Sequence, residues 1–143
     1  MRIILWRTNL EKEWKNLDKM TEQLITFETA KLAKEKGLPQ LNNGIYYTKD
    51  KEHCLVGWGI DNLREYSAPT QSLLQKWLRE VHDIHVCVIT FNNSKGLYTI
   101  YTTYNKEEYH GNRDAQVWFK TYEEALEIGL QEALKLIKDE LVE

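Results

Sequence analysis

Long hydrophobic runs are missing from this sequence of 143 residues. A helix that spans a membrane needs about 18 or more consecutive apolar residues, and no stretch of the chain approaches that length. The N-terminal segment MRIILW is short and a charged residue follows it at once, so it lacks the pattern of a signal peptide. These absences predict a soluble, cytoplasmic protein that has no membrane partner.

Cysteine is scarce, and the usual metal-binding spacings are absent. Cys54 and Cys87 stand in apolar, strand-like runs, where we expect reduced and buried thiols, because a disulfide framework needs more cysteines and a secretory context. His82, His85 and Cys87 lie within six residues, yet neither C-x₂-C nor H-x₃-H occurs. The sequence therefore predicts a protein without disulfide, metal or cofactor.

Known catalytic motifs are missing as well. The patterns G-x-S-x-G, P-loop and G-x-G-x-x-G do not occur. Cys54 follows His53 directly, and adjacent residues of a strand point to opposite faces, so the two do not form a nucleophile and its base. One predicted hairpin loop gathers acidic residues and a histidine, namely Glu107, Glu108, His110 and Asp114. A solvated loop tip is favoured there over an acid–base site, and no catalytic residue is predicted.

Neither sign of charge dominates the chain. There are 22 acidic and 19 basic residues, which give a formal net charge of −3. Proteins that bind nucleic acid or membrane surfaces nonspecifically are usually strongly basic, so this balance argues against both activities. Aromatic side chains, in contrast, are abundant for a chain of this size, with eight Tyr and five Trp.

Residues 66–91 are the stretch around which the predicted fold is organised. Pro69 suits the first position of a helix over 69–82. The apolar stripe of that helix consists of Leu73, Leu74, Trp77, Leu78 and Val81. After a break at Asp83, the β-branched run IHVCVITF (84–91) predicts a central strand that is buried on both faces.

Further helices and strands are predicted on either side of this unit. A helix begins near Asn9 or at Thr21 and ends at Gly37, either as one long helix or as two in tandem. Strands are predicted over 45–48, 54–58, 97–104 and 115–119. The order α, β-β, α, β-β-β, α predicts an α+β fold, with three or four helices packed on a mainly antiparallel sheet of about five strands.

The C-terminal helix is predicted over 121–141. Thr121 and Glu124 form the best capping box in the chain. Ala125, Gly129 and Ala133 make a ridge of small residues, which would let the helix approach a sheet closely. Because glycine inside a helix costs about 1 kcal/mol relative to alanine, we expect a packing reason for Gly129.

A single domain over residues 1–143 is the predicted organisation. Thr21 can start a helix on its own and Met20 stands directly before it. One interpretation is therefore that residues 1–19 are an optional N-terminal extension of a core formed by 20–143. The alternative is that 1–19 is itself part of the core.

Three blocks of the sequence resemble a group of small proteins from gut bacteria and their phages or mobile elements. The blocks are TFETAKLAKEKG (26–37), SAPTQSLLQKWLREVHDIH (67–85) and KTYEEALEIGLQEALKLI (120–137), which together cover about a third of the chain. That group is uncharacterised. The resemblance implies an accessory protein of a mobile element, and it brings no activity, cofactor or catalytic residue with it.

Two sets of residues are candidates for binding. Gln71, Gln75 and Arg79 recur at every fourth position of the 69–82 helix and could reach base edges in a DNA groove, although ordinary solvated helix residues explain them more simply. Tyr101 and Trp118 belong to the aromatic surplus of the predicted sheet, and both residue types are enriched at interfaces.

The sequence thus predicts a protein that acts by binding a protein partner or by self-association. The sheet face that bears Tyr101 and Trp118 is the predicted contact surface. A nucleic-acid-binding module that uses Gln71, Gln75 and Arg79 is the alternative. A small enzyme is the third interpretation.

Overall fold

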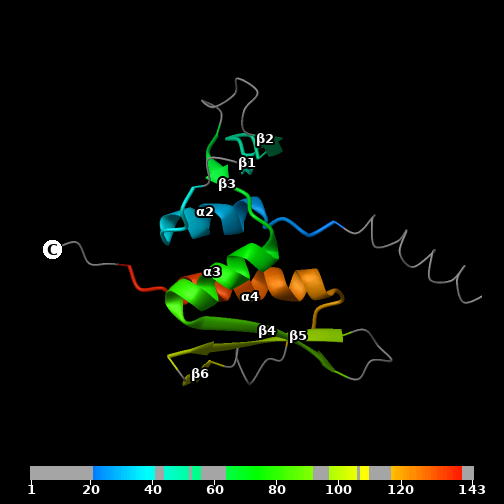
Figure 1. The fold of residues 1–143 in the computed structure, drawn as a ribbon. Helices are drawn as coiled ribbons and strands as arrows, with labels where there is room; N and C mark the ends of the chain where they lie inside the picture. Colours follow the sequence, from blue (N-terminus) through cyan, green and yellow to red (C-terminus); the bar gives the residue numbers. More distant parts are fainter. Residues whose placement is uncertain are drawn as a thin grey trace, which may run out of the picture.

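The computed structural model describes residues 21–40, 44–51, 53–55, 64–91, 97–105, 107–109 and 117–139. The helices in this part of the chain are α2 (Phe27–Glu35), α3 (Gln71–His82) and α4 (Tyr122–Leu136). They form a middle layer with a small sheet on either side of it (Figure 1). The fold is α+β, as predicted. No helix of the described ranges is long and apolar enough to cross a membrane.

The strands divide between two sheets, and every pairing is antiparallel. The first sheet has the order β2-β1-β3 and consists of β1 (Ile45–Tyr47), β2 (His53–Leu55) and β3 (Tyr66–Ser67). The second has the order β4-β5-β6 and consists of β4 (Ile84–Phe91), β5 (Leu97–Tyr104) and β6 (Glu107–Tyr109). The described residues therefore do not form the single sheet of about five strands that was predicted.

Two short strands were not predicted. β3 lies where a loop was expected, and β6 lies inside the expected hairpin loop over 105–114. Asn105 has a positive φ of 50°, which turns the chain so that Glu107 pairs with Tyr104. Of the strand predicted over 115–119 the structure describes 117–119, and that of 54–58 is described only to Leu55.

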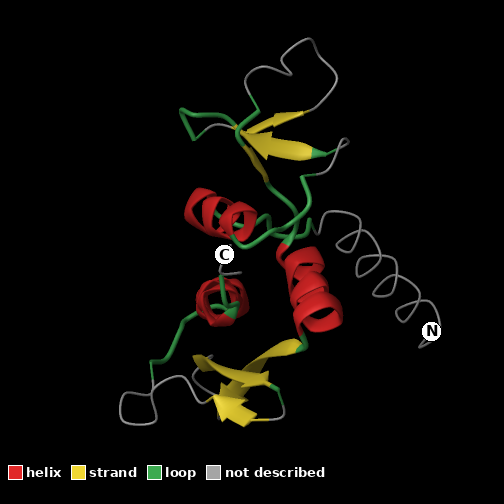
Figure 2. Ribbon diagram, turned by 90° about the vertical axis from the view of Figure 1, so that its left-hand side faces the viewer, coloured by secondary structure: helices red, strands yellow, loops and turns green. Residues whose placement is uncertain are grey.

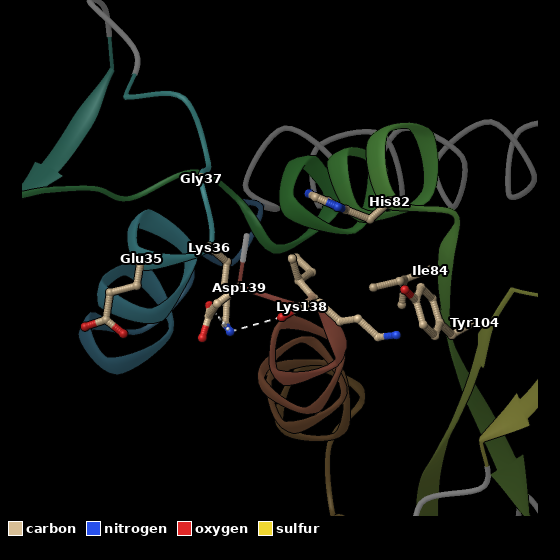
Figure 3. A pocket seen from close by; sticks show the side chains of 9 residues that line it. Glu35, Lys36, Gly37, His82, Ile84, Tyr104, Lys138 and Asp139 are labelled. Carbon is tan, nitrogen blue, oxygen red and sulfur yellow. Dashed lines mark hydrogen bonds and ion pairs between the residues drawn. The ribbon is translucent and has the colours of Figure 1, made fainter. Parts of the chain in front are cut away.

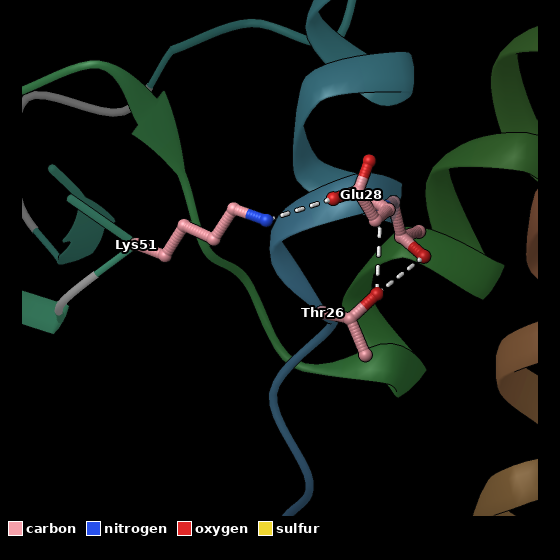
Figure 4. A network of polar contacts seen from close by, with 4 residues as sticks. Thr26, Glu28 and Lys51 are labelled. Atoms are coloured by element: carbon pink, nitrogen blue, oxygen red, sulfur yellow. Dashed lines mark hydrogen bonds and ion pairs between the residues drawn. The ribbon is translucent and has the colours of Figure 1, made fainter. Parts of the chain in front are cut away.

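Helix α2 begins later than Thr21, the predicted start. Its N-cap is Thr26, whose Oγ1 accepts a hydrogen bond from the Thr29 N–H at 3.4 Å (Figure 4). The residues before the cap stay extended because Leu24 bridges to Thr70. Gly37, with φ of 94°, follows the helix end as predicted. Residues 1–20, including the possible start near Asn9, lie outside the described residues.

Helix α3 is capped by Thr70, whose Oγ1 accepts from the Leu73 N–H at 3.3 Å. Pro69 consequently precedes the cap and is not the first helical residue, which corrects the prediction. The helix ends at Asp83, a left-handed residue with φ of 53°, whose N–H donates to the Leu78 carbonyl. This single residue separates α3 from β4, so the helix leads directly into the strand.

Helix α4 begins at the predicted cap and ends earlier than predicted. Thr121 Oγ1 accepts from the Glu124 N–H at 3.1 Å. The described helix stops at Leu136, and Lys36 Nζ donates to the carbonyl of Ile137 at 3.0 Å. An amine from α2 thus binds the backbone where the helix was expected to continue to 141.

The apolar core lies between the helices and extends to both sheets. Its fully buried large side chains include Ile25, Leu74, Leu78, Leu130 and Leu134. Gly129 lets α4 lie directly on the second sheet, because a Cβ at this position would stand 2.7 Å from Val86 Cγ1 and 3.1 Å from Ile100 Cγ2. The close approach that the small-residue ridge predicted is confirmed.

Candidate functional site

The β4-β5-β6 sheet has one face against the helices and one face turned away from them. Helices α3 and α4 lie on one side of the sheet, and no helix of the described residues covers the other side (Figure 2). We call that second side the outer face. Its described side chains are His85, Cys87 and Ile89 of β4, Leu97, Thr99, Tyr101 and Thr103 of β5, and Trp118.

Strand β4 alternates between the two faces, and this corrects two predictions. Ile84 and Val86 are buried under the helices, whereas His85 and Cys87 are exposed and Ile89 is 45% exposed. The strand is therefore not buried on both faces, and Cys87 is a free, exposed thiol instead of a buried one. The cause is that helices pack on one side of the sheet only, so every second residue of β4 faces outward.

Tyr101 and Trp118 lie on the same face. Tyr101 pairs with Cys87 across β5 and β4 and so shares its outward direction. Tyr98 and Phe119 exchange backbone hydrogen bonds of 2.9 and 2.8 Å. Because side chains alternate along an extended chain, Trp118 stands one residue before Phe119 on the outer face. Two aromatic residues that are distant in the sequence thus share one face of the sheet, and both are half-buried.

The described side chains of the outer face are mostly aromatic or β-branched. Its described side chains include no Asp, Glu, Lys or Arg. The one basic group, His85, lies 3.1 Å from the carboxylate of Asp83. Interface centres are depleted of charge and enriched in Tyr and Trp, which supply apolar area together with one hydrogen-bonding group. This composition suits contact with a polypeptide better than contact with a polyanion.

Gln71, Gln75 and Arg79 are not presented together on an open helix face. Gln71 is 5% exposed, and its Nε2 donates to Glu127 Oε2 at 2.7 Å. The Nε2 of Gln75 donates to the Val86 carbonyl at 2.7 Å. Only Arg79, of these three, is exposed. Both glutamine amides are therefore used inside the protein, against α4 and β4.

The partner of Gln71 belongs to a buried polar network that the sequence pattern does not reveal. The Glu127 carboxylate of α4 accepts from the Thr26 N–H at 2.8 Å, from the Thr29 hydroxyl and from Gln71. A buried carboxylate is tolerated when hydrogen bonds replace its lost hydration. This one joins α2, α3 and α4 by their polar groups. In sequence Glu127 looks like any solvated helix residue.

A cavity of about 590 Å³ lies where the C-terminal ends of the three helices meet β4 and β5 (Figure 3). Lys36 at its wall binds the Ile137 carbonyl and, at 2.7 Å, Asp139 Oδ1. His82 Nε2 is buried without a hydrogen-bond partner among the described residues, and burial lowers the pKa of His82. A catalytic base normally has an orienting acid, and no described hydrogen bond joins His82 to one.

A second hollow, of about 410 Å³, lies beside the Glu127 network. Its wall includes Thr26, Gln71 and Glu127, together with the exposed Glu123 and Glu124. Two donors in this wall, the Thr26 N–H and Gln71 Nε2, bind Glu127, so the hollow lies on the solvent side of the Glu127 network. Its described wall contains acidic side chains but no His, Lys or Arg.

The His and Cys residues considered as metal ligands do not converge. His82 lines the cavity among the helix ends, whereas His85 and Cys87 lie on the outer face. Within the described ranges no group of three or more His, Cys, Asp or Glu could hold a metal ion. The charged loop over 105–114, for which a solvated tip was favoured over an acid–base site, falls largely outside these ranges. The metal-free state stays a prediction.

Comparison of the chain with protein-family models, curated proteins and solved structures finds no match.

Proposed function

We propose that this protein is a binding module whose outer face contacts another polypeptide, either a distinct partner or a second copy. The observation that carries the proposal is the placement of Tyr101 and Trp118 together on a sheet face that no described helix covers. An accessory role in a mobile element agrees with this proposal and stems from the sequence resemblance alone.

The chemistry of the face favours a protein over a nucleic acid. Nucleic-acid affinity comes mainly from Lys and Arg that neutralise phosphates, and the outer face has none among its described side chains. The aromatic rings could stack on unpaired bases, but a stacking platform normally lies in a basic groove. A neutral aromatic centre is what protein interfaces use.

Partner capture with the full chain tests the proposal. The tagged protein is incubated with extract of its native host and the recovered proteins are identified by mass spectrometry. In a Tyr101→Ser/Trp118→Ser variant we expect partner affinity to fall by about thirtyfold or more, because removing an interface hot spot costs about 2 kcal/mol. Light scattering across concentrations distinguishes a second copy from a distinct partner.

Three matched variants keep this experiment interpretable. Tyr122→Ser removes an exposed aromatic of α4 away from the outer face, and it should leave capture intact. Thr99→Glu adds a charge to the outer face without deleting a ring, and it should weaken capture as strongly as the aromatic change. Arg79→Ala should matter only if nucleic acid is bound. Salt-sensitive oligonucleotide binding that survives both outer-face changes would overturn the proposal.

A further inference from the structure

Helix α3 carries an exposed apolar stripe in addition to its buried one. Leu73 is 45% exposed and Val81 is 62% exposed, and Trp77 between them is partly buried. The three follow one another at every fourth position, so they lie along one side of the helix. The predicted apolar stripe is therefore divided, since Leu74 and Leu78 are fully buried whereas Leu73 and Val81 are exposed. Trp77, between the two exposed residues, is partly buried and packs against the core.

Residues 22–24 lie beside the N-terminal end of this stripe, and residues 1–20 precede them closely in the sequence. The Gln71 N–H donates to the Gln23 carbonyl at 2.8 Å, and Leu24 bridges to Thr70. Ser72 Oγ donates to Glu22 Oε2 at 2.9 Å. Residues 22–24 are thus bound to the first turn of α3, one residue away from Leu73.

The sequence of this preceding segment matches the stripe in period and length. Trp6, Leu10, Trp14 and Leu17 follow at intervals of four, four and three residues, which places them on one face at helical spacing. Trp6 to Leu17 is twelve residues, and α3 is also twelve residues long. At 1.5 Å per residue either stretch is about 18 Å long as a helix, so one can cover the other.

We propose that residues 1–20 dock in cis on the Leu73–Trp77–Val81 stripe of α3. The tryptophan and leucine side chains of the segment supply apolar surface that can cover the exposed stripe. The hydrogen bond between Gln71 and Gln23 keeps the segment close to the stripe. The segment is then part of the folded unit, in contrast to the optional extension that the sequence suggests. This inference is independent of the outer face and of the binding function proposed for it.

Hydrogen exchange of the full chain, followed by mass spectrometry, tests the docking. We expect amides within 6–17 to exchange slowly in the unmodified protein. In Leu73→Asp/Val81→Asp their protection should fall by about tenfold or more, because a segment without its docking surface opens locally. Ile128→Asp, which alters an exposed apolar residue of α4, is the matched control and should leave the protection unchanged.

A second variant tests the docking even if the Leu73→Asp/Val81→Asp protein does not fold. Trp14→Asp/Leu17→Asp changes only the segment and should free the amides of 6–17 while β4 and α4 stay protected. Fast exchange of 6–17 in the unmodified protein, or protection that survives both double variants, would overturn the proposal. Protection that disappears on dilution would also overturn it, because the stripe would then be covered by a second copy.

Discussion

Glu127 is the residue on which the contact between the three helices depends most. It is 8% exposed, and its carboxylate accepts one backbone and two side-chain hydrogen bonds from α2 and α3. Gln131 extends the network by donating to the Thr29 hydroxyl at 2.9 Å. Removing an acceptor here would leave buried donors without partners, which costs more than the loss of an exposed contact.

Glu127→Gln is expected to lower the free energy of unfolding by about 1–3 kcal/mol, the cost of one unpaired buried donor. The new Nε2 group would face either Gln71 Nε2 or the Thr26 and Thr29 donors, so at least one acceptor position is lost. Urea unfolding at neutral pH measures the change. Glu124→Gln, an exposed neighbour on α4, is the control. Equal stability of the two variants would show that the network is not structural.

His82 is expected to make the fold sensitive to mild acid. Burial lowers its folded-state pKa below the ordinary 6.5, so its contribution to stability is complete above that pH and is lost as the pH falls below it. His82→Phe removes this group and its unpartnered Nε2, while it keeps a ring beside Trp77. The variant should lose less stability than the parent between pH 7.5 and 5.5. A steeper loss in the variant would contradict this assignment.

The roles of single residues could be predicted from the sequence only where their partners are close in the chain. The caps at Thr121 and Gly37 could be predicted because their partners are three or four residues away. The role of Gln71 could not, because its partner is Glu127, which lies 56 residues further along the chain. Both side chains have ordinary helix-surface chemistry, and only the packing of α3 against α4 makes them a buried pair.

At the scale of elements, β4 and β5 were predicted with the bounds that the structure has, 84–91 and 97–104. Each is rich in β-branched and aromatic residues and is bounded by turn signals. β3 and β6 were missed because two or three residues carry no readable period, and pairing with β1 or β5 defines them. Burial of β4 was overestimated because an apolar run does not reveal how many layers cover it.

Substitution of Gly129 tests how closely α4 packs against the β4-β5-β6 sheet. Alanine would gain about 1 kcal/mol of helix propensity, but its Cβ would meet the buried Val86 methyl at 2.7 Å. Overpacking of this kind costs about 1–3 kcal/mol, so we expect Gly129→Ala to be destabilising in spite of its better propensity. Thermal unfolding measures the difference. Higher stability of the variant would show that the sheet side chains move aside without loss of stability.

At the scale of the whole molecule, the two sheets lie on opposite sides of the helices (Figure 1). The sequence predicted the α+β class but placed all strands in one sheet. Strand order across the chain depends on long-range pairing that no single segment encodes. The same arrangement decides that Tyr101 and Trp118 face outward together, and the proposed function follows from that consequence of the fold.

The rate at which Cys87 is alkylated reports whether the outer face is covered when the protein binds its partner. Its thiol is exposed on the outer face and pairs across the strands with Tyr101. The Cys54→Ser protein has Cys87 as its sole thiol. Its alkylation rate is measured for the isolated chain at low concentration, and again for the chain in complex with the captured partner or, where the protein self-associates, in its oligomeric form. The control is a Cys54→Ser/Cys87→Ser protein that also carries Ser72→Cys. Its only thiol lies on α3, away from the outer face, and its alkylation rate is measured in the same two states.

If the outer face is the contact surface, alkylation of Cys87 should slow by about tenfold or more in the complex, because a buried interface centre excludes solvent and reagent. Alkylation at Ser72→Cys should keep its rate. An unchanged rate at Cys87 in a complex shown to be saturated would contradict the account and place the contact on another surface.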